Sequence, residues 1–373
     1  MKKSLFMMLL LLFAVQMHAQ QVYYVKPVAT GLGDGSSWDN AGDLRTALDS
    51  VSANTQIWAM AGTYLDSFTI KCPVEIYGSF SGEEDSPDDR DLTTLSSILT
   101  TSYAISFCCK PKDHALCDSG YDCTIDGFII KESGNGYLYG GGICMGRANV
   151  TLRNLIIERN FAQCGGGIYL YYCSGRIENV IIKDNYVWDH SAGLYLAYCS
   201  NMTLVNVLFE GNNSATGNIP NNTSPQGIIS VTRWGGAMYM QNSSAVIINC
   251  TFASSNAADS GSAITCSGST AMVYNTIFDN LEFLRIPNQN PSSITFRNCD
   301  LYQTTVRPGG WVLYKFTCIN SDPMFQSGLH LQPGSPCKNA GYNLAVPSDV
   351  TMDLDLQLRI SENIVDMGAY EFQ

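Results

Sequence analysis

Three stretches of the chain decide the fold, because they repeat one pattern: Thr151-Leu-Arg-Asn-Leu-Ile-Ile-Glu-Arg-Asn160, Arg176-Ile-Glu-Asn-Val-Ile-Ile-Lys-Asp-Asn185 and Met202-Thr-Leu-Val-Asn-Val-Leu-Phe-Glu-Gly-Asn212. The central asparagine recurs along the chain, with a glycine in its place at the start, at Gly127, Asn154, Asn179, Asn206, Asn249, Asn275 and Asn298. The steps between these positions are 27, 25, 27, 43, 26 and 23 residues. Such a step is too short for the crossover helix of a βαβ unit, so each step is one turn of a solenoid built from strands.

Apolar residues alternate within each step. They stand one and three positions after the asparagine, as in Leu155 and Ile157 or Val207 and Phe209. An alternation of period two puts them on one face of a strand, and stacked coils turn them into continuous interior rows. The asparagines should form a row of their own at a corner with left-handed or bridge backbone, where their amides bond between coils.

A second strand follows a corner of small residues in each coil. These corners and strand starts are Gly140-Gly-Gly-Ile143, Gly165-Gly-Gly-Ile168, Ser191-Ala-Gly-Leu194, Gly235-Gly-Ala-Met238 and Gly261-Ser-Ala-Ile264. With only 14% charged residues, the composition favours short strands and tight turns over long exposed helices. The sequence therefore predicts an all-β chain, a single-stranded right-handed parallel β-helix.

Both ends of such a solenoid must be covered, since they expose core and unpaired strand edges. Between Asn40 and Ser52 the apolar residues fall on one helical face, at Leu44, Ala47, Leu48 and Val51. A capping helix with Asp39 or Asn40 as its N-cap is expected there. After Asp322 the repeat stops, and an irregular C-terminal cap is expected to close the other end.

The predicted organisation begins with a signal peptide at residues 1–19: Lys2 and Lys3, an apolar run from Leu5 to Val15, and a cleavage site after Ala19. A β-helix domain then spans 20–373, with an N-terminal cap and first coils at 20–123, regular coils at 124–321 and a closing segment at 322–373. The apolar run is too short to span a bilayer, and no other stretch reaches 18 apolar residues. We therefore expect a secreted protein, periplasmic, outer-surface or extracellular, with no membrane span after cleavage.

The formal charge of −12 argues against nucleic acid as a partner. Cysteines are expected to be of two kinds. Five could close loops near the start (Cys72, Cys108, Cys109, Cys117 and Cys123), and Cys318 and Cys337 could join near the end. Others stand where further coils have apolar residues and are expected to be buried, namely Cys250, Cys266 and Cys299. No Cys/His spacing supports a metal site.

The paired signatures Gly-Gly-Gly-Ile and Phe209-Glu-Gly-Asn212 resemble the repeats of polymorphic outer membrane proteins and of secreted pectin-lyase-like β-helix proteins. The flanks are similar to the same proteins, at Ser37-Trp-Asp-Asn-Ala41, Ile57-Trp-Ala-Met-Ala-Gly-Thr-Tyr64, Ile76-Tyr-Gly-Ser-Phe-Ser-Gly-Glu83, Ser335-Pro-Cys-Lys-Asn-Ala-Gly341 and Asp366-Met-Gly-Ala-Tyr-Glu-Phe372. Leu356 stands where the family's Asp-x-Asp-Gly pattern has Gly, so no ion is assigned to Asp353 and Asp355. The resemblance implies a β-helix that hosts lyases, hydrolases, adhesins and spacers alike.

Candidate ligand-binding residues come from the second strands. Tyr169, Tyr195 and Tyr239 occupy one position in successive coils, with Tyr171 two residues on. Outward rings stacked about 5 Å apart would form an aromatic strip for sugar rings. Two interpretations stay open at this point: a ligand strip, or rings that stack only on each other to stabilise the sheet.

Two loops lead into those strands and add aromatic and ionisable groups. One holds Trp188, Asp189 and His190, and the longer one, Gly211 to Gly235, ends in Arg233 and Trp234. Long insertions in a repeat array usually lie on the binding side. Trp188-Asp189-His190 is similar to a string found in pectate lyases but lacks one residue of it, and a solvated loop is the competing interpretation.

Catalysis finds little support in the sequence. A lyase needs a base and commonly Ca²⁺ held by carboxylates, and an inverting glycosidase needs two facing carboxyls. The nearest cluster is Asp85, Asp88, Asp89 and Asp91, which reads as a solvated loop. No catalytic residue is assigned, and no cofactor is expected, with Ca²⁺ considered only for a lyase.

One outward strip is apolar, at Ile156, Ile181, Leu208 and Ile277. A loop or the chain end could cover it, or it could bind a partner. The leading hypothesis is a β-helix that binds an extended ligand, in the first place a polysaccharide or another cell-surface ligand. The alternatives are a polysaccharide lyase or glycoside hydrolase, and a protein adhesin or structural spacer.

Overall fold

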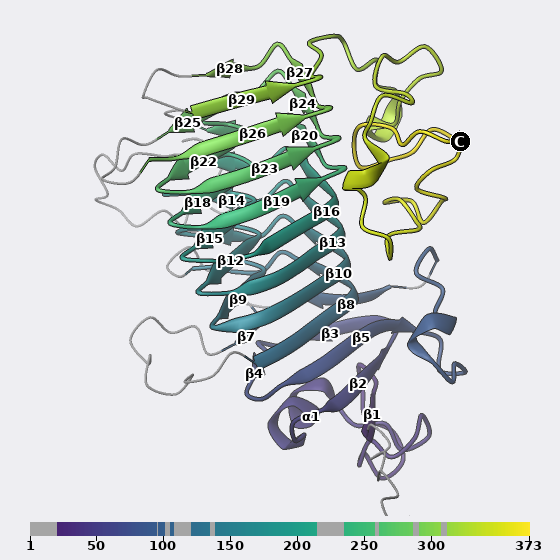
Figure 1. Ribbon diagram of the computed structural model, residues 1–373. Helices are drawn as coiled ribbons and strands as arrows, with labels where there is room; N and C mark the ends of the chain where they lie inside the picture. Colours follow the sequence, from purple (N-terminus) through teal and green to yellow (C-terminus); the bar gives the residue numbers. More distant parts are fainter. Residues whose placement is uncertain are drawn as a thin grey trace, which may run out of the picture.

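The computed structural model describes residues 21–94, 96–100, 105–107, 121–134, 139–214, 235–257, 261–285, 291–306 and 312–373. The predicted signal peptide, Arg233 and Trp234 lie outside these residues. Within them, no helix is long and apolar enough to cross a membrane. The chain winds through coil after coil of parallel strands, which stack into the column seen in Figure 1.

The largest sheet runs the length of the column. Its continuous path is β1 (Gln21–Val25), β2 (Thr55–Met60), β5 (Val74–Phe80), β8 (Tyr121–Lys131), β10 (Ala148–Glu158), β13 (Ser174–Lys183), β16 (Met202–Glu210), β19 (Ser244–Ile248), β23 (Thr270–Tyr274), β26 (Ser293–Arg297) and β29 (Val312–Phe316). Shorter strands join the same sheet: β3 (Gly62–Leu65), β6 (Ser97–Thr100), β20 (Thr251–Ala253), β24 (Ile277–Asp279) and β27 (Asp300–Tyr302). The asparagines were expected just before the strands, but Asn154, Asn179 and Asn206 lie within β10, β13 and β16 of this sheet.

Two further sheets complete each coil. The second consists of β4 (Thr69–Ile70), β7 (Ile105–Phe107), β9 (Ile143–Gly146), β12 (Ile168–Tyr171), β15 (Leu194–Ala197), β18 (Met238–Gln241), β22 (Ile264–Ser267), β25 (Glu282–Arg285) and β28 (Thr305–Val306). The third consists of β11 (Phe161–Ala162), β14 (Tyr186–Val187), β17 (Asn213–Ser214) and β21 (Asn256–Ala257). The predicted parallel β-helix is confirmed, and the second strands begin where the sequence places them.

The interior consists of the predicted apolar rows. Leu155, Ile157 and Val207 are fully buried. Phe209 stacks on Phe252 with ring centroids 4.5 Å apart, and Phe252 stacks on Phe278 at 4.7 Å. Cys250, Cys266 and Cys299 are buried among these side chains, as expected. Burying this much apolar surface is the main stabilising term of the fold.

The asparagine row, defined as Gly127, Asn154, Asn179, Asn206, Asn249, Asn275 and Asn298, turns each coil through left-handed backbone. All seven residues have positive φ, from +49° to +80°. Asn179 Nδ2 donates to Asn154 Oδ1 at 3.4 Å, and Asn206 Nδ2 donates to Asn179 Oδ1 at 2.9 Å. The row begins at a carboxylate, because Asn154 Nδ2 donates to Asp126 Oδ1 at 2.8 Å.

A second amide row, the inner asparagine row, lies at the corner after the main sheet and consists of Asn160, Asn185 and Asn212, all fully buried. Asn160 Nδ2 donates to Asn185 Oδ1 and Asn185 Nδ2 to Asn212 Oδ1, both at 3.0 Å. The same carbonyl oxygens accept the main-chain N–H groups of Asn160 and Asn185. Polar atoms at this corner therefore find partners inside the protein.

A short helix covers the N-terminal end. It is α1 (Leu44–Ser50), and its buried residues Leu44, Ala47 and Leu48 join the main core. The N-cap is Asp43, whose carboxylate accepts the N–H of Thr46 at 2.8 Å. The prediction of Asp39 or Asn40 was wrong, because those residues lie in the turn before the helix, where Asn40 Oδ1 accepts the N–H of Leu32.

The C-terminal segment, residues 322–373, lies along the side of the column rather than across its end. Figure 1 shows it in yellow, beside the edge formed by β16 to β27. It contains two 3₁₀ turns, η4 (Ser327–Leu329) and η5 (Asn343–Ala345), and its residues contact the asparagine row from Asn206 to Asn298. The segment was expected to close the end of the column, and that location was wrong, because it covers part of the outer apolar strip instead. Leu208 packs against Ala369 and Tyr370, and Ile277 against Leu331 and Met367.

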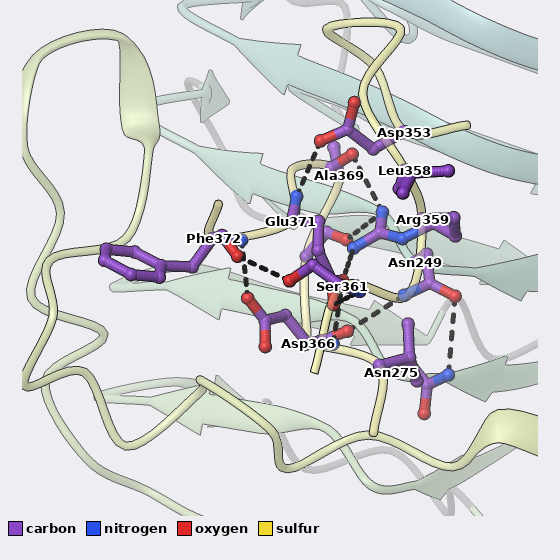
Figure 2. A network of polar contacts seen from close by, with 12 residues as sticks. Asn249, Asn275, Asp353, Leu358, Arg359, Ser361, Asp366, Ala369, Glu371 and Phe372 are labelled. Atoms are coloured by element: carbon purple, nitrogen blue, oxygen red, sulfur yellow. Dashed lines mark hydrogen bonds and ion pairs between the residues drawn. The ribbon is translucent and has the colours of Figure 1, made fainter. Parts of the chain in front are cut away.

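Buried charges fix this segment. Arg359 and Glu371 are each about 1% exposed and form an ion pair of 2.8 Å. Arg359 Nη1 also donates to Asn206 Oδ1 at 3.1 Å and to the carbonyl oxygen of Ala369 at 3.0 Å. Figure 2 shows this network. Asp353 accepts the N–H of Glu371 at 2.8 Å, so its carboxylate holds a turn of the segment.

The expected link between Cys318 and Cys337 does not form. Cys337 Sγ donates to Asp300 Oδ2 at 3.2 Å, while the thiol of Cys318 lies against Cys299 one coil away. The thiols of Cys72 and Cys123 are also free. Cys108, Cys109 and Cys117 lie outside the described residues.

Candidate functional site

The tyrosine row, Tyr169, Tyr195 and Tyr239, is aligned as predicted, since these residues pair across β12, β15 and β18. The rings are only 8%, 7% and 4% exposed, so the expected open strip was wrong. Neighbouring rings meet edge to face, with centroids 5.1 and 4.7 Å apart. Edge-to-face packing is the arrangement that aromatic quadrupoles favour, and it closes the faces that a sugar would need.

Other side chains complete this cluster. Cys144, Cys164 and the half-buried Tyr139 pack with the three rings. The hydroxyl of Tyr195 donates to Gln241 Oε1 at 2.8 Å, which satisfies the one polar atom that burial would otherwise leave without a partner. Burial raises the pKa of Tyr195 and Tyr239 far above that of a free phenol. The row therefore stabilises the sheet, which is the second of the two interpretations left open by the sequence.

The loop residues Trp188, Asp189 and His190 lie beside the tyrosine row, as predicted. Trp188 is buried, and the His190 ring lies 5.5 Å from that of Tyr239. Asp189 Oδ2 is 3.3 Å from Gln163 Nε2 and 3.7 Å from Cys164 Sγ. Arg233 and Trp234, predicted to join this group, lie outside the described residues.

The chemistry available to this loop is limited. Burial lowers the pKa of His190, and the neighbouring Asp189 opposes that shift only in part. The imidazole is therefore neutral near pH 7. Burial raises the pKa of the Cys164 thiol, and Asp189 raises it further, so this cysteine is protonated and a poor nucleophile.

The acidic loop near the N-terminus has a structural role. Asp91 accepts hydrogen bonds from the hydroxyls and main-chain N–H groups of Thr93 and Thr94, which lower the pKa of its carboxyl. Asp88 and Asp89 belong to the 3₁₀ turn η1 (Pro87–Asp89), which Ser86 caps. Among the described residues, no group of three or more Cys, His, Asp or Glu side chains could hold a metal ion.

An exposed aromatic group lies at the next corner, between the second and main sheets. We call Tyr171, Tyr172 and Tyr198 the tyrosine platform. Tyr172 and Tyr198 are 47% and 39% exposed, and their rings stack with centroids 5.1 Å apart and planes 14° apart. Tyr171 meets them edge on, at 4.5 and 5.9 Å. The Arg147 guanidinium lies 5.5 Å from the Tyr172 ring centroid.

The platform belongs to a column of left-handed residues, one from each coil. In chain order they are Arg147, Tyr172, Tyr198, Asn242 and Gly268, with φ between +46° and +63°. Glycine and asparagine accept such backbone easily, whereas a bulky side chain there costs roughly 1 kcal/mol or more. The chain therefore carries two aromatic rings in solvent at a conformation that disfavours them. Strain retained at exposed residues points to function.

The backbone beneath the platform is tightly held. A buried row of small polar side chains lines the corner, at Cys173, Cys199, Ser243, Ser269 and Ser292. Each side chain after the first accepts a hydrogen bond from the main-chain N–H of the previous member of the row, one coil earlier. Cys199 Sγ accepts from Cys173 at 3.4 Å, and Ser243 Oγ accepts from Cys199 at 2.9 Å. The platform rings thus stand on a rigid edge, which fixes their spacing.

The sequence analysis named Tyr171 but missed Tyr172 and Tyr198. A signal existed: the dipeptide Tyr-Cys occurs at 172–173 and again at 198–199, one coil apart. In each case the cysteine faces inward at the corner, so the preceding residue must be the one that points to solvent. The shared position of Tyr169, Tyr195 and Tyr239 in successive second strands predicts that these rings face solvent, whereas the structure buries them.

Comparison with known proteins agrees with the architecture. The family described as right handed beta helix region matches residues 100–229 and 141–335. A crystal structure of pectate lyase Pel9A is similar at 13% identity and a TM-score of 0.44, covering 95% of this chain and 97% of its own. The GH136 lacto-N-biosidase from Eubacterium ramulus is similar at 12% identity and a TM-score of 0.32, covering 81% and 68%. No curated protein sequence matches the chain significantly.

Proposed function

The chain belongs to the right-handed β-helix family, and from that premise we propose that it binds an extended polysaccharide through the tyrosine platform, without cleaving it. Secretion to the periplasm or the cell exterior is part of the proposal and rests on the predicted signal peptide. The observation that carries the proposal is the pair of stacked, exposed rings of Tyr172 and Tyr198.

The shape and polarity of a sugar ring are complementary to the tyrosine platform. A pyranose offers an apolar face of C–H groups and a rim of hydroxyls, which match an aromatic face and a phenolic hydroxyl. In the column of left-handed residues, Tyr198 is followed by Asn242 and Gly268, which carry no ring. A sugar placed over these two smaller residues would continue the stack at the spacing of the coils, about 4.8 Å.

The charge distribution favours a neutral glycan. The chain carries a formal charge of −12, which repels uronates and sulfated sugars at a distance. Arg147 is the cation that contacts the platform, and its guanidinium lies over the Tyr172 ring, where it contributes a cation–π contact. We therefore expect neutral polysaccharides to bind more tightly than acidic ones at low salt.

The experiment measures binding of soluble neutral and acidic polysaccharides by affinity electrophoresis and calorimetry. The variants Tyr172→Asn and Tyr198→Asn copy the residue that the chain itself uses at position 242, so the fold should tolerate them. Each should weaken binding by about 1 kcal/mol, roughly fivefold, the scale of one aromatic contact. The control Tyr314→Ala removes another exposed ring, on β29, and should leave affinity unchanged.

Unchanged affinity in the double variant would remove the platform from the proposal. Failure of every glycan to bind would leave a protein adhesin or spacer as the better hypothesis. Incubated polysaccharide is also sized and assayed for new reducing ends. Shortened products that require the platform tyrosines would replace binding with a lyase or hydrolase activity.

A further inference from the structure

A cavity of about 190 Å³ lies on the outer face of the main sheet, between the N-terminal loop that follows β5 and the C-terminal segment. Its floor includes Ile156 and Ile181 of the apolar strip, and Ile129, which pairs with Ile156 in the neighbouring coil. Its walls are leucines from the two flanking segments, namely Leu92, Leu354 and Leu356. Asn154 and Asn179 of the asparagine row also line it, so amide groups face an otherwise apolar space.

The asparagines under the C-terminal segment show what these amides can do. Asn206 Nδ2 donates to Asn179 Oδ1 at 2.9 Å and also to the carbonyl oxygen of Met352 at 2.8 Å. Asn275 Nδ2 likewise donates to Asn249 Oδ1 at 3.4 Å and to the carbonyl oxygen of Tyr342 at 3.2 Å. An amide NH₂ has two hydrogens, and Asn206 and Asn275 each use one for the row and one for a main-chain carbonyl.

Asn154 and Asn179 use one amide hydrogen along the row and give none to a described main-chain carbonyl. Within the described residues, Asn154 Nδ2 donates to Asp126 and Asn179 Nδ2 to Asn154 Oδ1. No described carbonyl takes the second hydrogen of either. Both side chains line the cavity, so two N–H donors are available to an acceptor placed there.

The C-terminal segment also shows the spacing that an occupant needs. Ala340 accepts from Asn298 at 3.1 Å, and Tyr342, two residues on, accepts from Asn275, one coil away. Alternate residues of an extended main chain therefore reach successive positions of the asparagine row. A peptide lying over Asn179 and Asn154 could repeat this pattern with the carbonyls of its residues i and i+2.

We infer that this cavity is a docking site for an extended, uncharged, apolar peptide segment of a partner protein, which continues along the asparagine row where the C-terminal segment stops. An uncharged occupant is expected because no ionisable side chain is among the described residues that line the cavity. Arg90 and Arg359 lie outside that lining, where Arg90 shares Asp126 with Arg153 and Arg359 pairs with Glu371 at 2.8 Å. Small apolar side chains fit because the floor and walls are Ile and Leu.

Leu356 gives independent support. It has φ of +60°, and it stands where the resembling family's pattern has Gly, the residue that this backbone favours. Its side chain lines the cavity. A leucine kept in strained backbone with its side chain at a cavity is consistent with a contact surface rather than with local stability.

The test measures binding of two blocked tripeptides, acetyl-Val-Ala-Val-amide and acetyl-Leu-Ala-Leu-amide, by the NMR shifts of the asparagine side-chain amides. Acetyl-Asp-Ala-Asp-amide serves as the charged comparison. The variant Ile156→Trp fills the cavity, and Met272→Trp places the same ring at an exposed outward position of the same sheet as its control. Leu356→Gly removes one wall and should not destabilise the fold.

Binding of an apolar tripeptide that shifts the amides of Asn154 and Asn179, and that Ile156→Trp and Leu356→Gly weaken at least tenfold, supports the inference. Met272→Trp and Tyr198→Asn should leave this affinity unchanged, which separates the cavity from the tyrosine platform. No binding by either apolar peptide, or equal binding by Ile156→Trp, overturns the inference. The inference is also overturned if neutral oligosaccharides bind, the Ile156→Trp variant loses that binding, and the peptides do not bind.

Discussion

Arg90 and Arg359 contact the asparagine row on either side of Asn154 and Asn179: Arg90 lies beside Gly127, and Arg359 lies beside Asn206. Arg90 Nη1 lies 2.7 Å from the position that a Cβ on Gly127 would take, so it packs closely against the glycine. Arg359 Nη1 bonds to Asn206 Oδ1. One arginine comes from the N-terminal loop and the other from the C-terminal segment, and each is buried against a carboxylate. Arg90 therefore joins the N-terminal loop to β8 through an ion pair, whereas Arg359 pairs within the C-terminal segment and reaches the β-helix through its hydrogen bond to Asn206.

Replacing Arg359 by Met should release the C-terminal segment. The change leaves Glu371 buried without its partner, which typically costs about 3–5 kcal/mol. Burial already raises the pKa of Glu371, so the loss of stability should become smaller as the pH falls and the lone carboxyl takes up a proton. Urea unfolding at pH 5 and pH 7.5 and limited proteolysis of the segment check this.

Lys338→Met is the matched control, because Lys338 pairs with Glu362 at the surface, where removing a pair costs at most about 1 kcal/mol. An Arg359→Met protein as stable and as protease-resistant as the parent would mean that apolar contacts alone hold the segment.

Tyr195 and Tyr198 should respond to substitution in opposite ways. Tyr195→Ala empties a buried site, removes two edge-to-face contacts and deletes the bond to Gln241, so it should destabilise the protein by about 3–5 kcal/mol. Tyr198→Asn removes an exposed ring from left-handed backbone, and stability should change by less than about 1 kcal/mol. Thermal unfolding of both variants tests the assignment. Equal losses would contradict the division into a structural row and an exposed platform.

The sequence predicts the coils well for a physical reason. The interior positions around Asn154, Asn179 and Asn206 repeat at nearly constant steps, and period-two alternation then leaves one inward face and one set of corners. Equivalent positions of neighbouring coils pack on each other, so the repeat length alone identifies which residues are in contact. The left-handed backbone at the asparagines follows equally from local preferences.

The candidate site is less predictable, because exposure depends on what packs from outside. Tyr169, Tyr195 and Tyr239 face outward from the core, yet His190 lies against Tyr239 and the three tyrosines are packed with their neighbours in a buried cluster. The C-terminal segment has no repeat, so nothing local shows that Leu208 lies under Tyr370. The ion pair between Arg90 and Asp126 joins residues whose proximity only the assembled coils define.

Asn185→Ala removes only a few atoms but should lower the stability of the protein strongly. Asn185 Oδ1 accepts both the main-chain N–H and the side-chain amide of Asn160, and its own amide donates to Ile157 O and Asn212 Oδ1. The substitution leaves several buried polar groups unpaired, so a loss of at least about 2 kcal/mol is expected. Asn149→Ala is the control, since Asn149 is exposed and its two side-chain hydrogen bonds, to Asp122 and from Ser174, lie at the surface. Similar stability for the two variants would show that water reaches the inner asparagine row.

Cys318 should be the most reactive of the described cysteines. A hydrogen bond from the Cys299 thiol, larger in effect than the opposing burial, lowers the pKa of Cys318 to about 7, whereas burial raises that of Cys299 well above its usual value. At pH 7 about half of Cys318 is then the nucleophilic thiolate, against a few per cent for an ordinary thiol. As pH rises from 6 to 8, alkylation of Cys318 by iodoacetamide should increase and level off. Labelling at Cys72, whose pKa burial raises, should still be rising at pH 9.

Peptide mapping of the reduced, labelled protein resolves the individual sites. Cys299→Ala removes the donor, so the pKa of Cys318 should return toward its usual range and its labelling at pH 7 should fall several-fold. The sign is fixed by the direction of that hydrogen bond, because a donor stabilises the thiolate and not the thiol. If labelling of Cys318 at pH 7 is the same with and without Cys299, the contact between the two coils does not tune this thiol.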